Sequence, residues 1–337
     1  MDLSLFDFNL PAELIANRPI EPRNVSRLLI GSSPIVHENF NNILNFIEKD
    51  DLIITNNSKV IPSYFLINYK SNKIKITFHK KIKNDEWLAF IKPGKKIKIG
   101  ESINLSEDHS FKIKDKTKNG DYLIKIDTNE SLIFDKFGKM PLPPYILKSR
   151  ESDEKDFKDY QTIYASQKGS IAAPTAGLHF NKKIYDTLKE NNQLAEVTLH
   201  VGLGTFKPIR GNINDHKMHS EAGIITNEVV ELIKEKKSKK GRIISVGTTT
   251  LRLLETAALS GDLLPFRGTT NIFIKPGFKF KVVDMLLTNF HLPKSSLMLL
   301  VSSFSGISEI KKIYREAIDK NYRFYSYGDV SLLYKHE

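Results

Sequence analysis

Three histidines lie in segments where they could exchange protons with a substrate near neutral pH. His179 ends a stretch of small residues, His219 stands two residues before Glu221, and His291 lies in a polar segment ahead of an apolar run. An imidazole titrates near neutral pH, and a neighbouring carboxylate can share the work of proton transfer. These four residues are the candidate catalytic groups. A structural histidine in a helix-capping turn is the competing interpretation of His179.

The pair His216 and His219 has a three-residue spacing that can also bind zinc. A four-coordinate site needs further ligands, and the chain has no cysteine to supply thiolates. We therefore predict no metal site. Acid–base chemistry or contacts with RNA phosphates are better uses of these imidazoles.

Glycines and hydroxyl groups mark the candidate binding segments. Thr175 and Gly177 lie in the stretch before His179, where small residues let a ligand approach the backbone. Gly202 and Gly204 resemble half of a dinucleotide fingerprint, but the third glycine and the following helix are missing. They could form a wall against an adenosine, and a plain β-bulge fits them as well.

Residues 247–252 (GTTTLR) run from an apolar strand into a helix. Backbone N–H groups and hydroxyls at a helix start suit a carboxylate or phosphate, so Thr249 and Thr250 could hold an anion. Arg252 could add a bidentate contact. The spacing is not that of a P-loop, and a simple N-cap is the competing interpretation.

Two later segments mix polar, aromatic and basic residues. Asn289 lies within residues 288–296, and Tyr327 and Asp329 close the run 322–329. Aromatic and arginine side chains can stack unpaired bases, whereas burial in a core is the commoner use of such aromatics. Asn289, Tyr327 and Asp329 join the substrate-binding candidates.

Alternating strands and helices must position these segments. The expected strands are residues 51–57, 195–200, 241–246 and the apolar run 297–301, and the expected helices are residues 181–191, 226–240, 249–260 and 308–321. Such alternation predicts an α/β fold, a mixed sheet with flanking helices.

Residues 61–150 show a different pattern, in which apolar and polar residues alternate in short segments separated by glycine and Asn-Gly turns. This pattern predicts a small antiparallel β-barrel domain. Because residues 1–60 also contain a buried strand, we expect the barrel to be inserted into a discontinuous α/β domain formed by residues 1–60 and 151–337. From Lys73 to Lys98 there are nine lysines and two acids. These lysines could follow an RNA backbone or protect sheet edges.

The composition narrows the class of protein. The chain has 337 residues, 40% of them hydrophobic, and a net charge of +12. The charge fits a polyanionic partner, and it also fits the lysine-rich composition of an AT-biased genome. The N-terminus lacks a basic region ahead of an apolar run, and no apolar stretch reaches the ~18 residues of a membrane helix. We expect a soluble cytoplasmic protein.

Taken in order, these segments resemble one family nearly end to end, the S-adenosylmethionine:tRNA ribosyltransferase-isomerases of queuosine synthesis. The resemblance is carried by residues 8–11, 14–16, 26–29, 56–62, 141–146, 160–165, 173–180, 200–206, 216–221, 247–252, 287–295 and 322–329. Each motif is modestly specific, and their number and order make the joint match strong. The chain departs from the family at Lys59 and Tyr64, where arginines are usual.

The resemblance implies transfer and isomerisation of the ribosyl part of S-adenosylmethionine. The acceptor is the aminomethyl group of 7-aminomethyl-7-deazaguanine at the tRNA wobble position, and epoxyqueuosine-tRNA, adenine and methionine are the products. S-adenosylmethionine is a consumed co-substrate, and no metal or redox cofactor is implied. The expected partners are this tRNA and S-adenosylmethionine, without a membrane, and the expected state is a monomer. Asn56 and Asn57 are expected to border the site.

Two other functions remain compatible with the residues. An S-adenosylmethionine-dependent RNA methyltransferase should have a glycine-rich loop early in its α/β domain with an acid about 20 residues later, and the turn at Gly202 does not fit that pattern. A non-catalytic RNA-binding protein fits the charge but leaves the histidine- and threonine-bearing segments without a purpose.

Overall fold

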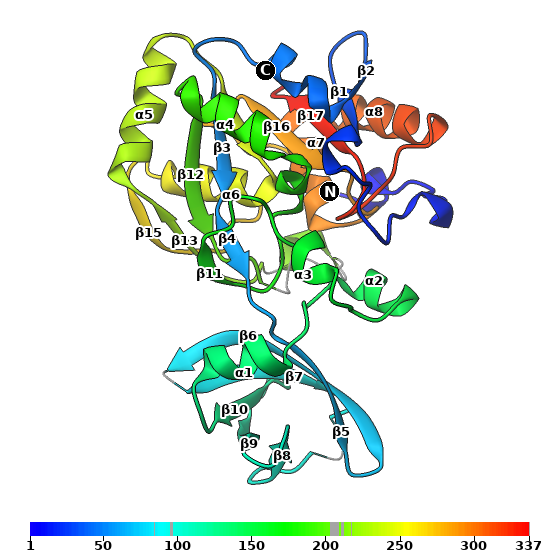
Figure 1. The fold of residues 1–337 in the computed structure, drawn as a ribbon. Helices are drawn as coiled ribbons and strands as arrows, with labels where there is room; N and C mark the ends of the chain where they lie inside the picture. The colour runs from blue at the N-terminus through cyan, green and yellow to red at the C-terminus, as the bar shows by residue number, and fades with distance from the viewer. Residues whose placement is uncertain (84, 95–96, 203–208, 210–211, 217, 337) are drawn as a thin grey trace. The chain divides into compact units, whose positions relative to one another are not determined.

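The computed structural model describes residues 1–83, 85–94, 97–202, 209, 212–216 and 218–336 (Figure 1). The chain divides into two compact units. Unit 1 consists of Met1–Lys59 and Gln161–Glu337, and unit 2 consists of Val60–Tyr160. Residues 151–160 thus group with unit 2.

Within the described residues, nine strands of unit 1 form a mixed sheet in the order β15-β13-β12-β3-β14-β16-β17-β1-β2. Their bounds are β1 Arg27–Ile30, β2 Val36–Asn39, β3 Leu52–Asn56, β12 Leu194–Leu199, β13 Glu221–Ile225, β14 Ile243–Val246, β15 Phe266–Thr270, β16 Met285–Asn289 and β17 Val330–Tyr334. Strands β12, β3, β14 and β16 run parallel to one another. Strand β17 is antiparallel to β16, and β1 is parallel to β17. A short separate sheet pairs β4 (Ser58–Val60) with β11 (Gln167–Ser170).

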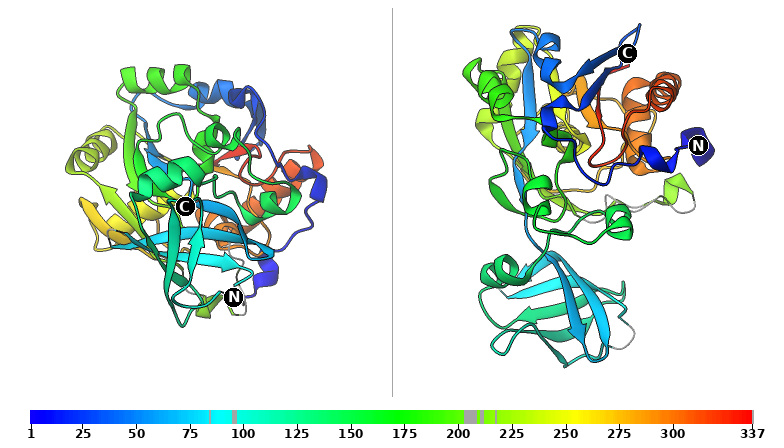
Figure 2. Two further views of the ribbon diagram at one scale, coloured as in Figure 1. Left: turned by 60° about the horizontal axis from the view of Figure 1, so that its bottom comes forward. Right: turned by 45° about the vertical axis from the view of Figure 1, so that its right-hand side comes forward.

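Helices connect and cover these strands, as the two views in Figure 2 show. The α-helices that follow β11 are α4 Lys182–Glu190, α5 Asn227–Ser238, α6 Thr248–Ala257, α7 Ser296–Ser305 and α8 Ile307–Asp319. The 3-10 helices of unit 1 are η1 Leu3–Phe6, η2 Ala12–Leu14, η3 Arg23–Val25, η4 Phe40–Phe46, η5 Thr175–His179 and η7 Ile213–Asp215.

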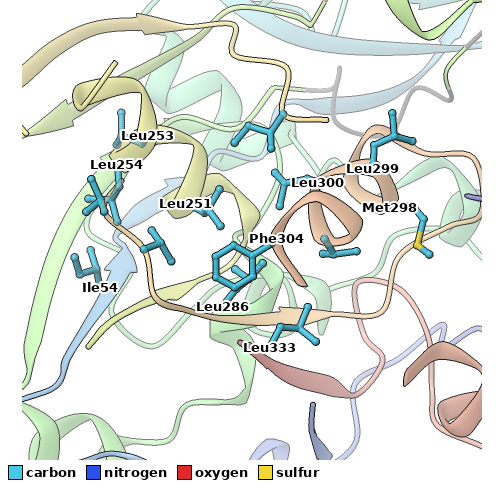
Figure 3. Close-up of a cluster of buried hydrophobic side chains, with 14 of the residues drawn as sticks. Ile54, Leu251, Leu253, Leu254, Leu286, Met298, Leu299, Leu300, Phe304 and Leu333 are labelled. Atoms are coloured by element: carbon cyan, nitrogen blue, oxygen red, sulfur yellow. The ribbon is translucent and has the colours of Figure 1, made fainter. Parts of the chain in front are cut away.

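Successive side chains of the central strands point to opposite faces of the sheet and pack in two cores, one on each face. Ile54 packs in the core that contains α5, α6, α7 and α8, whereas its neighbour Ile53 packs with η4, η5 and α4. Figure 3 shows part of the first core, where Leu251 of α6 and Phe304 of α7 lie with Leu286 of β16. A sheet that is covered on both faces needs continuous apolar strands, which explains why β3 and β14 lack a polar alternation.

Unit 2 contains a six-stranded antiparallel sheet in the order β5-β6-β7-β10-β9-β8. Its strands are β5 Tyr64–Tyr69, β6 Asn72–Lys83, β7 Glu86–Lys92, β8 Ser102–Asn104, β9 Ser110–Lys116 and β10 Tyr122–Ile126, and its helices are α1 Glu130–Phe137, α2 Pro144–Ser149 and α3 Asp156–Asp159. The ring of Phe78 lies 5.5 Å from Phe65 and 4.9 Å from Phe111. Helix α1 adds Phe134, 5.3 Å from the Trp87 ring. This aromatic core lets the sheet curl into a barrel-like form.

The fold class expected from the sequence is confirmed, a mixed α/β sheet with flanking helices together with a small antiparallel barrel-like sheet. The expected strand at residues 297–301 is wrong, because these residues lie inside α7. Met298, Leu299, Leu300 and Val301 are all buried, so this part of the helix shows no polar face. A short apolar run of that kind does not distinguish a buried helix from a buried strand.

Candidate active site

One edge of the unit 1 sheet collects the polar segments. The carboxyl ends of the parallel strands β3, β12, β14 and β16 meet at this edge, and β17 and β1 begin there. Asn56 and Asn289 end their strands, Gly247 follows β14, and Asp329 and Ser26 directly precede β17 and β1. Ligands of open α/β sheets bind outside the carboxyl ends of the strands. We therefore take this edge as the candidate active site.

His179 is buried at this edge and contacts three different segments. Its Nδ1 lies 2.6 Å from Ser26 Oγ, and its Nε2 lies 3.4 Å from Asn289 Nδ2. Thr175 Oγ1 donates to Asn289 Oδ1 at 2.8 Å. The η5 turn, the end of β16 and the residue before β1 thus hold one imidazole from three sides.

The hydrogen bonds of Asn289 fix the tautomer of His179. Because Asn289 Oδ1 accepts from Thr175, its Nδ2 faces both the Asp329 carbonyl at 3.3 Å and His179 Nε2. An amide nitrogen can only donate, so Nε2 carries the lone pair and the ring proton is on Nδ1 beside Ser26. Burial, together with the positive charges of Arg23 and Arg323, lowers the pKa of His179 to about 3. The imidazole is therefore neutral at pH 7.

The Asp329 carboxylate holds two chain segments together near His179 through hydrogen bonds to their backbones. Its carboxylate accepts from the backbone N–H of Arg27 at 2.9 Å and of Arg323 at 2.8 Å. Burial raises the pKa of Asp329, against the two backbone hydrogen bonds, which lower it. Asp329 therefore positions the start of β1 and the turn before β17.

A small pocket opens beside His179. Its wall is formed by Pro19, Ile20, Arg23, Leu178, His179, Ser326 and Tyr327. The predicted residue Tyr327 is buried against this wall. Arginine, imidazole and phenol groups around an apolar floor could bind a planar, polar ligand.

A buried ion pair lies at the other end of the same edge. Arg252 Nη1 donates to Glu221 Oε2 at 2.5 Å, and the two side chains are 2% and 4% exposed. Glu221 Oε1 accepts from the Gly202 backbone N–H at 3.0 Å. Arg252 Nε donates to the Ile272 carbonyl at 3.3 Å. Three of the predicted residues are thus joined in one chain of contacts that holds the backbone of Gly202 against the start of β13.

Helix α6 begins between these two groups. Its N-cap Gly247 has φ +85°, a conformation that glycine adopts without strain. Thr250 Oγ1 donates back to the Val246 carbonyl at 2.9 Å. Thr249 Oγ1 and Arg252 Nη2 are buried and have no hydrogen-bond partner among the residues that the structure describes. Burying a hydroxyl without a hydrogen-bond partner costs free energy, so we expect a polar ligand or a water molecule to bind at the start of this helix.

Asn56 and Asn57 link β3 to β12. The Asn56 side chain exchanges hydrogen bonds with the backbone of Leu199, donating and accepting at 2.9 Å. Asn57 donates to Glu196 Oε2 at 3.0 Å and accepts from Thr198 Oγ1 at 2.7 Å. Both amides therefore position the carboxyl ends of the two strands.

Gly177 is required by a close contact. A Cβ atom at this position would lie 1.8 Å from the Tyr164 hydroxyl oxygen. The Tyr164 ring stacks on Tyr185 at 5.4 Å and has little room to move. Burial raises the pKa of the Tyr164 phenol well above its ordinary value, and no described residue bonds to its hydroxyl. The hydroxyl thus lies directly beneath the turn that carries His179.

Three predicted residues remain, His291, His219 and Gly204. His291 is buried, its Nε2 lies 3.0 Å from Thr288 Oγ1, and its backbone N–H donates to the Tyr314 hydroxyl oxygen at 2.9 Å. Burial lowers the pKa of His291 to about 3. His219 is exposed just before β13. Gly204 lies outside the described residues.

Sequence reasoning missed Ser26, Tyr164 and Arg323 as members of this site. Ser26 and Tyr164 stood in segments that carry the family resemblance, at residues 26–29 and 160–165, and this was the only signal for them. Serine and tyrosine give no hint of their partners until the chain is folded.

Among the described residues, no group of three or more His, Asp or Glu side chains is arranged to hold a metal ion. None of the helices formed by those residues has the length and apolar character needed to cross a bilayer.

Comparisons with known proteins agree on one family. The model of the family described as queuosine biosynthesis protein matches residues 3–333. An S-adenosylmethionine:tRNA ribosyltransferase-isomerase of Rickettsia bellii is 45% identical over 99% of both chains, and one of Rhizobium etli is 42% identical over 99% of both. The crystal structure of an S-adenosylmethionine tRNA ribosyltransferase from Thermotoga maritima matches with TM-score 0.54 and 33% identity, over 97% of this chain and 99% of that one.

Proposed function

The chain belongs to the queuosine biosynthesis protein family, and from this we propose how its residues perform the ribosyl transfer of that family at the carboxyl edge of the nine-stranded sheet. The enzyme transfers and isomerises the ribosyl part of S-adenosylmethionine onto the aminomethyl group of 7-aminomethyl-7-deazaguanine in tRNA, and releases adenine and methionine. The observation that carries the proposal is the buried polar cluster around His179, within a family match that spans residues 3–333.

His179 is the proposed acid–base group. The sulfonium acidifies the C5′ hydrogens of S-adenosylmethionine, and a base must remove one of them. A neutral imidazole with its lone pair on Nε2 can accept that proton at pH 7. With a pKa of about 3, the neutral ring is a weak base, and the imidazolium that it forms would give the proton up readily to the departing adenine. Ser26 and Asn289 keep the ring in the required tautomer.

The start of α6 is the proposed site for the methionine carboxylate. Thr248, Thr249 and Thr250 occupy the first turn, where backbone N–H groups have no partner within the helix. The positive end of the helix dipole favours an anion. The unpartnered Thr249 hydroxyl would add a hydrogen bond to the carboxylate.

The Gly202 turn is the proposed wall against the adenosine. A Cβ at Gly202 would have no atom within 4 Å among the described residues. Glu221 holds its N–H, and Arg252 holds Glu221. We assign Glu221 and Arg252 to positioning this wall rather than to proton transfer or direct binding of the carboxylate. Gly204 belongs to the same proposed wall.

The other predicted residues take secondary roles in this proposal. Thr175 and Asp329 orient Asn289 and the chain beneath His179, while Tyr327 lines the pocket beside it. Asn56 and Asn57 hold the strand ends. His219 remains a candidate for contact with substrate because it is exposed near Glu221, and the buried His291 remains a candidate acid–base group of lower rank.

The proposed enzyme needs no metal or redox cofactor, since S-adenosylmethionine supplies both the transferred group and the leaving groups. We place it in the cytoplasm with its tRNA substrate, acting as a monomer. Light scattering at several protein concentrations tests the last point.

One incubation tests the reaction. The protein is mixed with S-adenosylmethionine and tRNA carrying 7-aminomethyl-7-deazaguanine, with unmodified tRNA as control. Free adenine that depends on the modified base supports the proposal. S-adenosylhomocysteine would indicate a methyltransferase, and neither product would indicate a non-catalytic RNA-binding protein. Histidine-to-glutamine replacement at residue 179 should abolish adenine release while retaining the fold.

A further inference from the structure

The lysines on the strands of the unit 2 sheet lie on its inner strands and not on its edge strands. The edge strands β5 and β8 contain no lysine, whereas the four inner strands β6, β7, β10 and β9 all do. Lysines that protect a sheet from edge-to-edge pairing belong on edge strands. Edge protection therefore does not explain these residues.

The register places like charges directly opposite one another. Lys75 of β6 pairs with Lys92 of β7, and Lys112 of β9 pairs with Lys125 of β10. The alternation of buried residues along β6 and β7 puts these lysines on the face opposite to Ile76 and the aromatic core. Like charges directly opposite on a sheet are destabilising, so such a pair needs a compensating partner.

The two lysine pairs differ in how far acids neutralise them. Lys125 forms an ion pair with Asp85 at 3.3 Å. Lys75 and Lys92 are exposed, and no described carboxylate lies within ion-pair distance of either. Glu86, opposite Lys125, is six residues from Lys92 along β7, about 20 Å at ~3.3 Å per residue. This exceeds the screening length of about 8 Å at physiological salt, so the acids at that end do not offset the charge at the other.

We propose that Lys73, Lys75 and Lys92, called here the lysine strip, bind the phosphate backbone of the substrate tRNA. Lys73 lies two residues before Lys75 on β6, on the same face and exposed. Three unneutralised ammonium groups on a rigid sheet match closely spaced phosphates, and the counterions released on binding provide the driving force. The proposal rests on the proposed function only in taking tRNA as the ligand, and it assigns the binding to one face of unit 2.

The face of the sheet that carries the lysine strip also carries two stacked rings, His79 and Phe90. His79 stacks on Phe90 with ring centroids 4.4 Å apart, both rings are partly buried, and His79 Nε2 lies 3.3 Å from Asp121 Oδ1. Phe90 lies two residues before Lys92 on β7. An aromatic surface beside a phosphate-binding lysine is the arrangement by which sheets bind single-stranded nucleotides.

The test compares three double variants of the full-length protein. K75Q/K92Q removes two charges from the lysine strip, and K75R/K92R keeps them. K118Q/K136Q is the matched control, because it removes two exposed lysines of unit 2 that lie in a turn and on α1. Equilibrium Kd for the modified tRNA is measured across a salt series, together with KM for S-adenosylmethionine and thermal unfolding.

We expect K75Q/K92Q to raise the tRNA Kd about tenfold and to reduce the slope of log K against log salt by about 1.5, at roughly 0.7–0.9 per lost phosphate contact. The arginine variant and the control should match the wild type, and KM for S-adenosylmethionine should not change. Thermal stability of K75Q/K92Q should be unchanged or slightly higher, since a repulsion is removed. If K75Q/K92Q and K118Q/K136Q show the same Kd and slope, the proposal is overturned. Failure of the proposed reaction would appear separately, as wild-type protein that binds tRNA in a salt-dependent manner but releases no adenine.

Discussion

Ser26 Oγ lies 2.6 Å from His179 Nδ1, across 153 residues of chain. Ser26 directly precedes β1, and His179 ends the η5 turn above the carboxyl edge of the sheet. With Asn289 on the opposite nitrogen, this contact fixes which side of the imidazole carries a lone pair.

Replacing Asn289 by aspartate should slow catalysis, because it changes which nitrogen of His179 carries the ring proton. A carboxylate cannot donate to His179 Nε2, so it would draw the ring proton onto that nitrogen and remove the lone pair. We expect kcat to fall by about 10²–10⁴, the usual contribution of a positioned acid–base group, with a smaller change in KM for S-adenosylmethionine. Ser331→Ala is the control, because Ser331 is a buried serine of β17 that bonds to the Thr288 carbonyl. Equal kcat for both variants would refute the role of Asn289.

The hydroxyl of Thr249 should matter for binding S-adenosylmethionine. Thr249→Val keeps the shape but removes a buried hydroxyl donor that has no described partner, whereas Thr249→Ser retains it. We expect KM to rise about tenfold in the valine variant, which corresponds to ~1.4 kcal/mol, and to stay near wild type in the serine variant. Steady-state adenine release measures both. A valine variant with normal KM would remove the carboxylate site from α6.

Breaking the Arg252–Glu221 pair should destabilise the fold. Arg252→Ala leaves a buried carboxylate without its partner, and such changes cost about 3–5 kcal/mol in the free energy of unfolding. The double variant R252M/E221L should recover most of that loss, because no buried charge remains. Urea unfolding of the single and double variants checks this prediction.

The same variants separate positioning from direct binding. If the pair only holds the Gly202 turn, R252M/E221L should raise KM for S-adenosylmethionine, and E221Q, which can still accept the Gly202 N–H, should raise it less. A KM that rises tenfold on loss of Arg252 and falls in E221Q, where the guanidinium is no longer neutralised, would instead indicate that Arg252 binds the carboxylate directly.

Gly177→Ala should be harmful, and a second change should partly rescue it. The added Cβ would lie 1.8 Å from the Tyr164 hydroxyl oxygen, so the turn that carries His179 must shift. Tyr164→Phe removes that oxygen, and the next contact, to the Cζ atom, is 2.9 Å. We expect adenine release to be lost in G177A and partly restored in G177A/Y164F. Y164F alone serves as the control, and absence of any rescue would contradict this account of the glycine.

Stability should fall as the pH drops below about 6.5. Burial lowers the pKa of His179 and His291 to about 3 in the folded state, from 6.5. Between these values the unfolded chain binds protons that the folded chain does not, so the free energy of unfolding rises with pH, by up to about 1.4 kcal/mol per pH unit for each histidine. Above pH 6.5 the contribution is complete. His291→Gln should reduce the slope by one histidine's share in urea unfolding between pH 6 and 4.5, and an unchanged slope would show that His291 is protonated in the folded state.

Much of the architecture followed from local pattern. The strands and helices from residue 181 to residue 257 carry clear periods, and glycine and threonine stand where β14 turns into α6. Helix α7 was not predicted from the pattern. A helix that is buried on all sides has no polar face, so its apolar run resembles that of a buried strand. The periodicity of apolar and polar residues indicates which face of an element is exposed to water, so it gives no information about an element that has no exposed face.

The sequence by itself determined the kind of fold, the family, and the set of polar residues from which a site had to be built. Only the tertiary structure decided how those residues pair. Glu221 and Arg252 were expected in separate roles, and folding places them 2.5 Å apart, 31 residues from each other in the chain. Ser26 gained a role only when β1 came to lie near η5. Side-chain type limits what a residue can bind, but a buried donor or charge must find its partner in space, and that partner is set by the packing of distant strands.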